Sequence, residues 1–202
     1  MDRVGFFGGS FDPIHLGHIH LAVQLLEKQK LNKVIFCPIR CSPDKQGSPP
    51  QLPLSQRLEM VDLALKGYPS FSLTTIEEEG AGPSYTVDTL KAFQKKNPEY
   101  KNSKFFLLLA QDTLEKFYLW KDVHSLCTLA PPIFGRRTLK NPDFKDYPDA
   151  KLAPLLEKSL VGMPVLQISA SDIRARIKNK LYYRHLLPPD VLDFIEINKL
   201  YS

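Results

Sequence analysis

The chain has 202 residues, 43% of them hydrophobic, which is enough to bury a sizeable core and excludes a disordered tail or a small disulfide-bonded domain. Its net charge of +5 is spread without long runs of one sign, which favours a polyanionic small ligand and predicts no nucleic acid as partner. Three cysteines without C-x-x-C spacing, no signal sequence and no long apolar run predict a cytoplasmic protein with reduced thiols and no membrane segment.

The first half of the chain alternates strand and helix patterns. Residues 4–8 form a short apolar run that ends in two glycines, and apolar residues follow at helical spacing from His18 onward. This order predicts a strand, a glycine turn and a helix. The next expected elements are a buried strand at 34–36 ended by Pro38, a helix over 54–65 closed by Gly67, and a strand at 71–75.

The second half repeats the alternation. We expect a helix around Leu90 stopped by Pro98, a strongly apolar central strand at 105–109, a strand near Ile133, and a last strand at 165–168. Because Pro131 and Pro132 have no N–H group to donate, they favour a sheet edge or a shifted register for the strand near Ile133. Two helical patterns follow, one around Ile173 and Ile177 and one over 189–195.

Strands and helices that alternate at these lengths predict an α/β fold, a Rossmann-like doubly wound parallel sheet with a small helical C-terminal piece. Ligands of such sheets bind at the carboxyl ends of the strands. We expect one domain over 1–202, with the sheet core in 1–160 and the last strand and helical part in 161–202. Two stretches rich in proline and charge, 38–53 and 136–158, are expected to be lids or binding loops, or else surface insertions.

The densest group of chemically capable residues is the stretch GGSFDPIHLGH, residues 8–18. Glycines between a strand and a helix let backbone N–H groups approach a ligand closely, and a helix N-terminus favours phosphate. His15 and His18 are three residues apart and so point the same way from a first helical turn, while Gly17 leaves room for a ligand. A metal site is the alternative, but no cysteine or carboxylate follows at ligand spacing. The stretch therefore predicts a phosphate site.

This stretch resembles the opening of the bacterial nicotinate-nucleotide adenylyltransferases, members of the nucleotidylyltransferase superfamily that shares an H-x-G-H element. The resemblance continues, in order, in residues 84–90 (SYTVDTL), in Asp112 with Trp120 and Lys121, and in residues 168–174 (ISASDIR). The H-x-G-H element alone is modestly specific, because class I aminoacyl-tRNA synthetases carry a similar one. Four motifs in order are highly specific, and they span nearly the whole chain.

The chain departs from the family pattern at four places. Asp44 stands where a loop motif usually has histidine, although Lys45 is kept. Ala110 and Ala170 replace a glycine and a serine, and residues 136–138 (RRT) replace an arginine-proline-glycine turn. The last difference concerns a binding loop, whose conformation in this chain therefore need not follow the family.

The resemblance implies that the phosphate of nicotinate mononucleotide attacks the α-phosphorus of ATP, with Mg²⁺ accompanying ATP, to give nicotinate adenine dinucleotide and pyrophosphate in NAD biosynthesis. It implies a transition-state role for His18 and a positioning role for His15. The residues expected at ATP and its phosphates are Gly8, Gly9, Ser10, Phe11, His15, His18, Lys45, Ser171 and Arg174. Those expected at the mononucleotide are Thr86, Asp112, Trp120 and Arg136. No metal site made by the protein alone is expected, and the sequence carries no prediction of oligomeric state.

Simpler roles stay open for several of these residues. Trp120 could be a packing residue, Asp112 or Thr86 a helix cap, and Arg174 a partner in a surface ion pair. Two other functions also stay open. One is an adenylyltransferase for another phosphorylated acceptor, such as nicotinamide mononucleotide or pantetheine phosphate. The other is a non-catalytic nucleotide- or RNA-binding module, which only the net charge supports.

Overall fold

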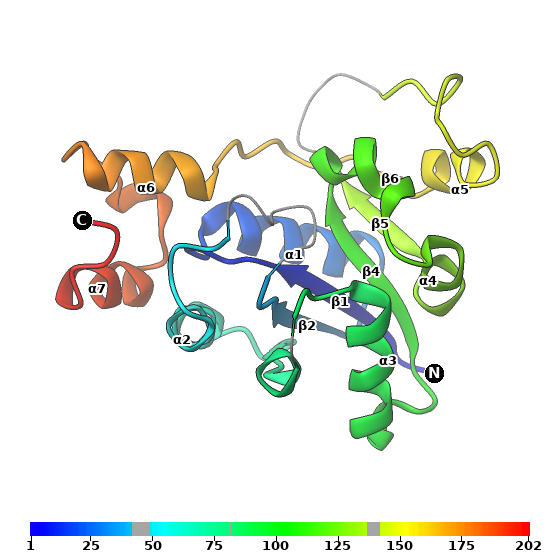
Figure 1. Ribbon diagram of the computed structural model, residues 1–202, viewed down its shortest axis with the longest axis horizontal. Coiled ribbons are helices and arrows are strands. Elements are labelled where there is room, and N and C mark those ends of the chain that lie inside the picture. The colour runs from blue at the N-terminus through cyan, green and yellow to red at the C-terminus, as the bar shows by residue number, and fades with distance from the viewer. Residues whose placement is uncertain (42–48, 81, 137–141) are drawn as a thin grey trace.

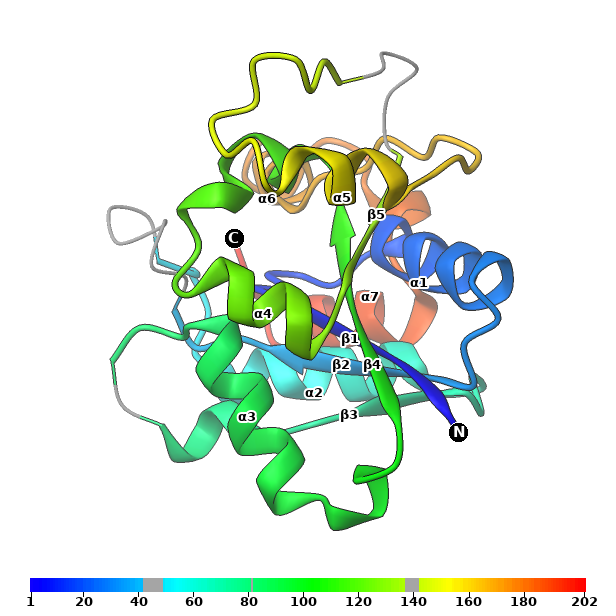
Figure 2. The ribbon, with the colours of Figure 1, turned by 90° about the vertical axis from the view of Figure 1, so that its right-hand side faces the viewer.

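The computed structural model describes residues 1–41, 49–80, 82–136 and 142–202 (Figures 1 and 2). Within these ranges six strands, all parallel, form one sheet in the order β3-β2-β1-β4-β5-β6. The strands are β1 Arg3–Gly9, β2 Lys33–Pro38, β3 Phe71–Leu73, β4 Lys104–Ala110, β5 Pro132–Gly135 and β6 Leu160–Val161. The expected parallel α/β sheet is confirmed.

Helices cover both faces of the sheet, as the continuous apolar strands require. Side chains alternate between the two faces, so that Phe7 and Leu108 belong to one core while Phe6 and Leu107 belong to the other. The first core is completed by α1 Leu16–Lys28, α2 Leu54–Leu65, α6 Ala170–Lys178 and α7 Pro189–Ile197. The second is completed by α3 Thr86–Lys96, α4 Val123–Leu129 and α5 Ala153–Lys158. Short 3-10 segments are η2 Ile76–Glu79, η3 Pro98–Tyr100, η4 Gln111–Leu119 and η5 Arg184–Leu186.

The last strand is not where the sequence predicts it. Residues 165–168 form no strand, and the chain instead pairs through β6, five residues earlier. Val165 and Leu166 are 37% and 39% exposed, so this apolar run does not supply a buried strand, and only Ile168 reaches the core. The prediction was wrong because three apolar residues in a stretch of four cannot distinguish a strand from a segment that buries one side chain.

Two further expectations need correction. The stretch 136–158 was expected to be a lid, a binding loop or a surface insertion, but it contains the helix α5. Leu156 of this helix is buried, as is Leu152 just before it, so this end of the stretch is part of the core. The strand with prolines at its start, β5, lies between β4 and β6 rather than at the edge. The sheet accommodates these prolines because the pairing at this point uses the carbonyl of Pro131, which accepts from the N–H of Leu107. No proline N–H is needed for this hydrogen bond.

The strand order reverses direction at the centre of the sheet. From β1 the chain proceeds outward to β2 and β3, and then returns to the other side of β1 with β4. Connections therefore leave β1 and β4 toward opposite faces, and a crevice opens beyond the carboxyl ends of these two strands, where ligands of open α/β sheets bind. The expected Rossmann-like arrangement, including the helical C-terminal piece of α6 and α7, is confirmed.

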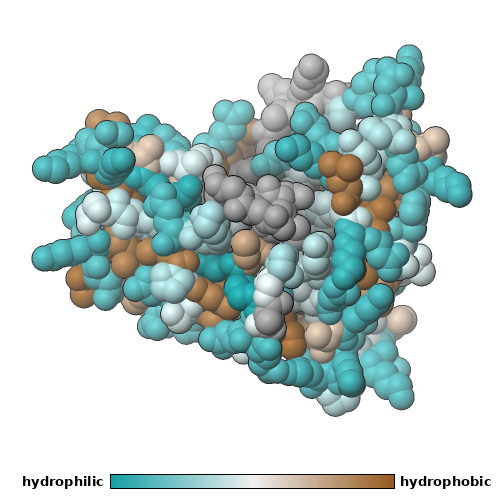
Figure 3. Space-filling model, viewed as in Figure 1, coloured by the Kyte–Doolittle hydropathy of each residue, from teal (hydrophilic) through white to brown (hydrophobic). Residues whose placement is uncertain are grey.

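The surface in Figure 3 is mostly hydrophilic, with hydrophobic residues in small separate patches. Across the described ranges, no helix has both the length and the apolar character needed to cross a membrane.

Candidate functional site

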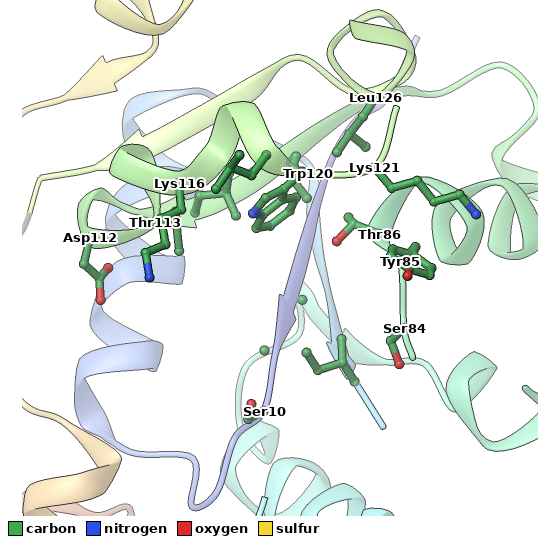
Figure 4. Close-up of a pocket in the computed structure, with 16 residues that line it drawn as sticks. Ser10, Ser84, Tyr85, Thr86, Asp112, Thr113, Lys116, Trp120, Lys121 and Leu126 are labelled. Carbon is green, nitrogen blue, oxygen red and sulfur yellow. The ribbon is translucent and has the colours of Figure 1, made fainter. Parts of the chain in front are cut away.

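Two adjoining cavities lie beyond the carboxyl ends of β1 and β4. The larger, of about 420 Å³, is drawn in Figure 4, and the smaller has a volume of about 150 Å³. They share the lining residues Gly8, Gly9, Leu109, Asp112 and Thr113. The two cavities thus occupy the crevice that the strand order predicts, and together they form the candidate site.

The glycine turn forms one wall of both cavities. A Cβ atom on Gly9 would lie only 2.9 Å from the ring of Phe11, so only glycine lets the ring fold back against the strand. Phe11 itself has φ +46°, a left-handed value that non-glycine residues seldom adopt, and its side chain is buried in the core. Gly8, Gly9 and Ser10 line the larger cavity with little side chain, which leaves their backbone exposed to a ligand.

The two histidines are stacked at the N-terminus of α1. Their ring centroids are 3.7 Å apart at an interplanar angle of 25°, and His15 is the N-cap residue, so the helix begins slightly before the expected position. The backbone N–H of His15 donates to Nδ1 of His18 at 3.2 Å. Since Nδ1 accepts, the neutral His18 ring carries its proton on Nε2, which makes Nε2 the donor. His18 lines the smaller cavity, while His15 is buried behind it.

Gly17 has a different role from the one expected. A Cβ atom there would lie 3.0 Å from Nδ1 of His15 and 3.3 Å from Cβ of Ile168. The space above Gly17 is therefore filled by protein rather than kept for a ligand, although the residue still lines the smaller cavity. The glycine allows the His15 ring and the segment before α6 to approach the helix.

A buried arginine that the sequence analysis missed supports the turn from behind. Arg57 of α2 is 1% exposed and donates to the carbonyls of Ser10 at 2.6 Å, Ile39 at 2.8 Å and Arg40 at 3.2 Å. It thereby joins the loops that follow β1 and β2. Burial lowers the pKa of Arg57, and the carboxylate of Asp12 opposes this effect. Its position on the apolar stripe of the predicted helix was the available signal.

The C-terminal motif approaches the site from α6. Ser169 caps this helix by accepting from the N–H of Asp172, and the Ser171 hydroxyl lies 3.1 Å from that of Ser169. Arg174 donates from Nη1 to the carbonyl of Asp12 at 2.5 Å. Ser171 and Arg174 line neither cavity, but Arg174 rests on the loop that leads into the histidine pair.

The predicted mononucleotide residues come from two sides of the larger cavity. Thr86, the first residue of α3, lies opposite Asp112 and Trp120, which belong to η4 or follow it (Figure 4). Two lysines of this cavity, Lys116 and Lys121, were not among the predicted site residues. Lys121 forms an ion pair with Asp88 at 2.8 Å, and that hydrogen bond raises the pKa of Lys121.

A buried glutamate fixes the segment before α3. Glu77 is 5% exposed and accepts from the hydroxyls of Ser84 and Thr89. The backbone N–H of Arg40 donates to the hydroxyl of Ser84 at 3.2 Å, and Nη1 of Arg40 donates to the Glu77 carbonyl at the same distance. Ser84 and Tyr85 line the cavity, so Glu77 sets their position. No sequence signal distinguished Glu77 from the two glutamates that follow it.

Five predicted residues that the structure describes line neither cavity: Phe11, His15, Ser171, Arg174 and Arg136. Lys45 lies outside the described residues. Arg136 follows β5, where its N–H donates to the carbonyl of Val161 at 3.1 Å, and it lines neither cavity. The other predicted residues each line at least one cavity: Gly8, Gly9, Ser10, His18, Thr86, Asp112 and Trp120.

The chain is similar to known proteins over nearly its whole length. Residues 6–176 match the Cytidylyltransferase-like family. The chain is 36% identical to the "Probable nicotinate-nucleotide adenylyltransferase" of Methylacidiphilum infernorum, over 98% of this chain and 92% of that protein. It is 34% identical to the protein of the same name from Thermomicrobium roseum, over 100% and 92% of the two chains.

Solved structures show the same fold. The Plasmodium falciparum nicotinic acid mononucleotide adenylyltransferase complexed with APC matches with a TM-score of 0.76 and 20% identity, over 100% of this chain and 98% of that one. The same enzyme complexed with NaAD gives a TM-score of 0.73 and 21% identity over the same shares. The fold and the full-length sequence identity lead to one conclusion: the chain belongs to the cytidylyltransferase-like family and, within it, to the nicotinate-nucleotide adenylyltransferases.

Proposed function

We propose that this chain, acting as one nucleotidyltransferase domain, joins ATP and nicotinate mononucleotide to give nicotinate adenine dinucleotide and pyrophosphate, a step of NAD biosynthesis. One observation carries the proposal. The adjoining cavities bring a glycine turn and His18, which suit phosphate, together with Trp120, which suits an aromatic base. A dinucleotide product needs both kinds of site within one crevice.

The reaction needs alignment and charge stabilisation more than proton transfer. A phosphate monoester is already anionic at neutral pH, so the mononucleotide can attack the α-phosphorus without a general base, and pyrophosphate leaves in line. The proton on Nε2 of His18, set by the His15 N–H bond to Nδ1, provides a donor to an oxygen of the reacting phosphate. His15 positions that ring by stacking on it. Arg174 and Lys45 are proposed to bind the triphosphate.

Mg²⁺ is proposed to enter with ATP. Among the residues that the structure describes, no group of three or more His, Cys, Asp or Glu side chains lies close enough to hold a metal ion. One carboxylate, that of Asp112, lines both cavities. This donor set fits Mg²⁺, which is usually held by substrate phosphates, water and one or two carboxylates. Bound with ATP, the ion would neutralise negative charge on the leaving pyrophosphate.

The pyridine end of the mononucleotide fits the larger cavity. The Trp120 ring offers a stacking surface. Thr86 begins α3, and the N–H groups of the first two helical residues precede the first hydrogen bond of the helix. Those donors and the ammonium group of Lys116 suit the nicotinate carboxylate, whereas the ammonium group of Lys121 is paired with Asp88. An amide NH₂ in the same place would face donors only. We therefore expect nicotinate mononucleotide to be preferred about 10- to 100-fold over nicotinamide mononucleotide.

The test is pyrophosphate release from ATP and Mg²⁺ with a panel of acceptors: nicotinate mononucleotide, nicotinamide mononucleotide and pantetheine phosphate. We expect the highest kcat/KM with the first. Turnover only with pantetheine phosphate, or nucleotide binding without turnover, would overturn the proposal. Equal kcat/KM for the two pyridine nucleotides would overturn only the proposed preference. Trp120→Leu should raise the KM for the mononucleotide. The control is Tyr182→Leu, because Tyr182 is exposed and lines neither of the two cavities.

A further inference from the structure

The side chain of Tyr201 reaches the loop that precedes the histidine pair. Its hydroxyl donates to Oδ1 of Asp12 at 2.7 Å. The chain turns back after α7 to allow this contact, with Leu200 buried and its N–H bonded to the carbonyl of Ile195. Tyr201 has φ +63°, a left-handed value that a bulky residue keeps only where its surroundings hold it. Burial and the charge of Asp12 raise the pKa of Tyr201, so the hydroxyl keeps its proton.

Asp12 joins four separate parts of the chain. It is 4% exposed and lies in the loop between β1 and α1. Its Oδ2 accepts from the N–H of Gln51, just before α2, at 2.7 Å, and lies 3.8 Å from Nη1 of Arg174 on α6. Tyr201 supplies the third partner, from the C-terminal segment. Each donor offsets part of the free-energy cost of burying the Asp12 carboxylate. A buried carboxylate with several donors is therefore held in one position.

Asp12 also orients Arg174, through a hydrogen bond to its main-chain carbonyl and through the charge of its carboxylate 3.8 Å away. Nη1 of this arginine donates to the Asp12 carbonyl at 2.5 Å, so its guanidinium lies directly on the β1–α1 loop. Its Nε has no hydrogen-bond partner among residues that the structure describes. The guanidinium is thus held at one end by Asp12, which fixes the direction in which its remaining N–H groups can meet an anion.

We propose that Tyr201 is a positioning residue for the ATP site, acting through Asp12 on both the loop that leads into His15 and the guanidinium of Arg174. The inference rests on the proposed function, in which Arg174 binds the triphosphate. Without the hydroxyl, Oδ1 of Asp12 lacks its donor, and the carboxylate can rotate toward Arg174 and draw the guanidinium away from its position. The loss should fall on ATP and leave the mononucleotide end unaffected, because Trp120 and Thr86 lie on other elements.

The experiment compares Tyr201→Phe with a matched control, Tyr183→Phe. The Tyr183 hydroxyl donates to Oε1 of Glu196 at 3.3 Å, so the control also removes a tyrosine–carboxylate bond from the C-terminal region, but one without contact to Asp12. Calorimetric titration with ATP and Mg²⁺ gives the ATP Kd, steady-state kinetics give both KM values, and thermal melting reports folding. Tyr201→Phe should weaken ATP binding about 3- to 10-fold with the KM of nicotinate mononucleotide unchanged, and the control should alter neither.

A double-mutant cycle with Arg174→Lys tests whether Tyr201 acts on ATP binding through Asp12 and Arg174. If Tyr201 acts through Asp12 on Arg174, adding Tyr201→Phe to Arg174→Lys should weaken ATP binding less than about 2-fold further. Unchanged ATP affinity in Tyr201→Phe, equal weakening for both substrates, the same loss in the control, or full additivity would each overturn the proposal. Should Tyr201→Phe not fold, Asp12→Asn replaces it with the same criteria.

The proposed function and this inference fail separately. A wild-type protein that binds ATP but does not use nicotinate mononucleotide would refute the function, while the titrations with ATP alone still decide the role of Tyr201. A wild-type protein that binds no ATP would overturn both.

Discussion

Replacing Gly17 with alanine would place a methyl group against the His15 ring. The added Cβ would lie 3.0 Å from Nδ1 and 3.1 Å from Cε1 of His15, and 3.3 Å from Cβ of Ile168. Ordinary contacts need about 3.4 Å or more, so the ring must move by roughly 0.4 Å. Because His18 stacks on His15 at 3.7 Å and its Nδ1 accepts the His15 N–H, the displacement reaches the donor at the cavity wall.

Two opposing effects set the change in stability that Gly17→Ala causes. Alanine gains about 1 kcal/mol over glycine in helix propensity, and overpacking costs about 1–3 kcal/mol, so the net loss of stability should be about 0–2 kcal/mol. For a chain of this length that lowers the Tm by less than about 8 °C. A misplacement of 1 Å at a reacting centre can cost about 100-fold in rate, so a shift of roughly 0.4 Å should lower kcat about 5- to 10-fold.

The assay is the steady-state rate of pyrophosphate release with both substrates saturating, together with thermal melting. Gly162→Ala is the control, because a Cβ atom there has no neighbour within 4 Å. We expect the control to keep the wild-type kcat. Wild-type kcat in Gly17→Ala, or an equal loss in Gly162→Ala, would show that contact with the His15 ring does not determine the rate.

Three other outcomes are expected. His18→Ala should lower kcat roughly 10²- to 10³-fold with an unchanged Tm, the scale of losing one preorganised donor, and near wild-type turnover would refute its role. Glu77→Gln should cost about 1–3 kcal/mol of stability, because the amide NH₂ cannot accept the hydrogen bond that the hydroxyl of Ser84 or Thr89 donates. It should raise the KM of the mononucleotide but not of ATP. Equal changes in both KM values would contradict this. Burial raises the pKa of Cys127 from 9.0 to about 11, so the folded state holds the proton that the unfolded state loses. Stability should fall by about 2–3 kcal/mol between pH 9 and 11 for this reason, and Cys127→Ala should make the decline shallower; an identical pH profile would exclude the thiol.

Local sequence determined the part of the site that lies within one turn. The glycines, His15 and His18 are neighbours in the chain, and helical geometry alone predicts that the two rings face the same way. Thr86, Asp112 and Trp120 were predicted at the mononucleotide by resemblance to a family, and all three line the larger cavity. Their convergence is explained by topology, since residues that follow parallel strands gather at the same edge of the sheet.

Tertiary structure alone decided which polar residues hold these elements in place. Arg57, Glu77 and Tyr201 make their hydrogen bonds mainly to segments distant in sequence, and no local pattern specifies such partners. The same limit explains the misplaced last strand. Apolar letters at 165–168 show that some side chain is buried, but pairing with β5 depends on where the chain returns to the sheet. The sequence by itself therefore determined the alternating elements and the glycine turn with its two histidines, because these depend on local geometry and hydrophobic period. The hydrogen-bond partners of buried polar side chains were decided only by the tertiary structure. Each such group must form a hydrogen bond with whatever group packing places beside it.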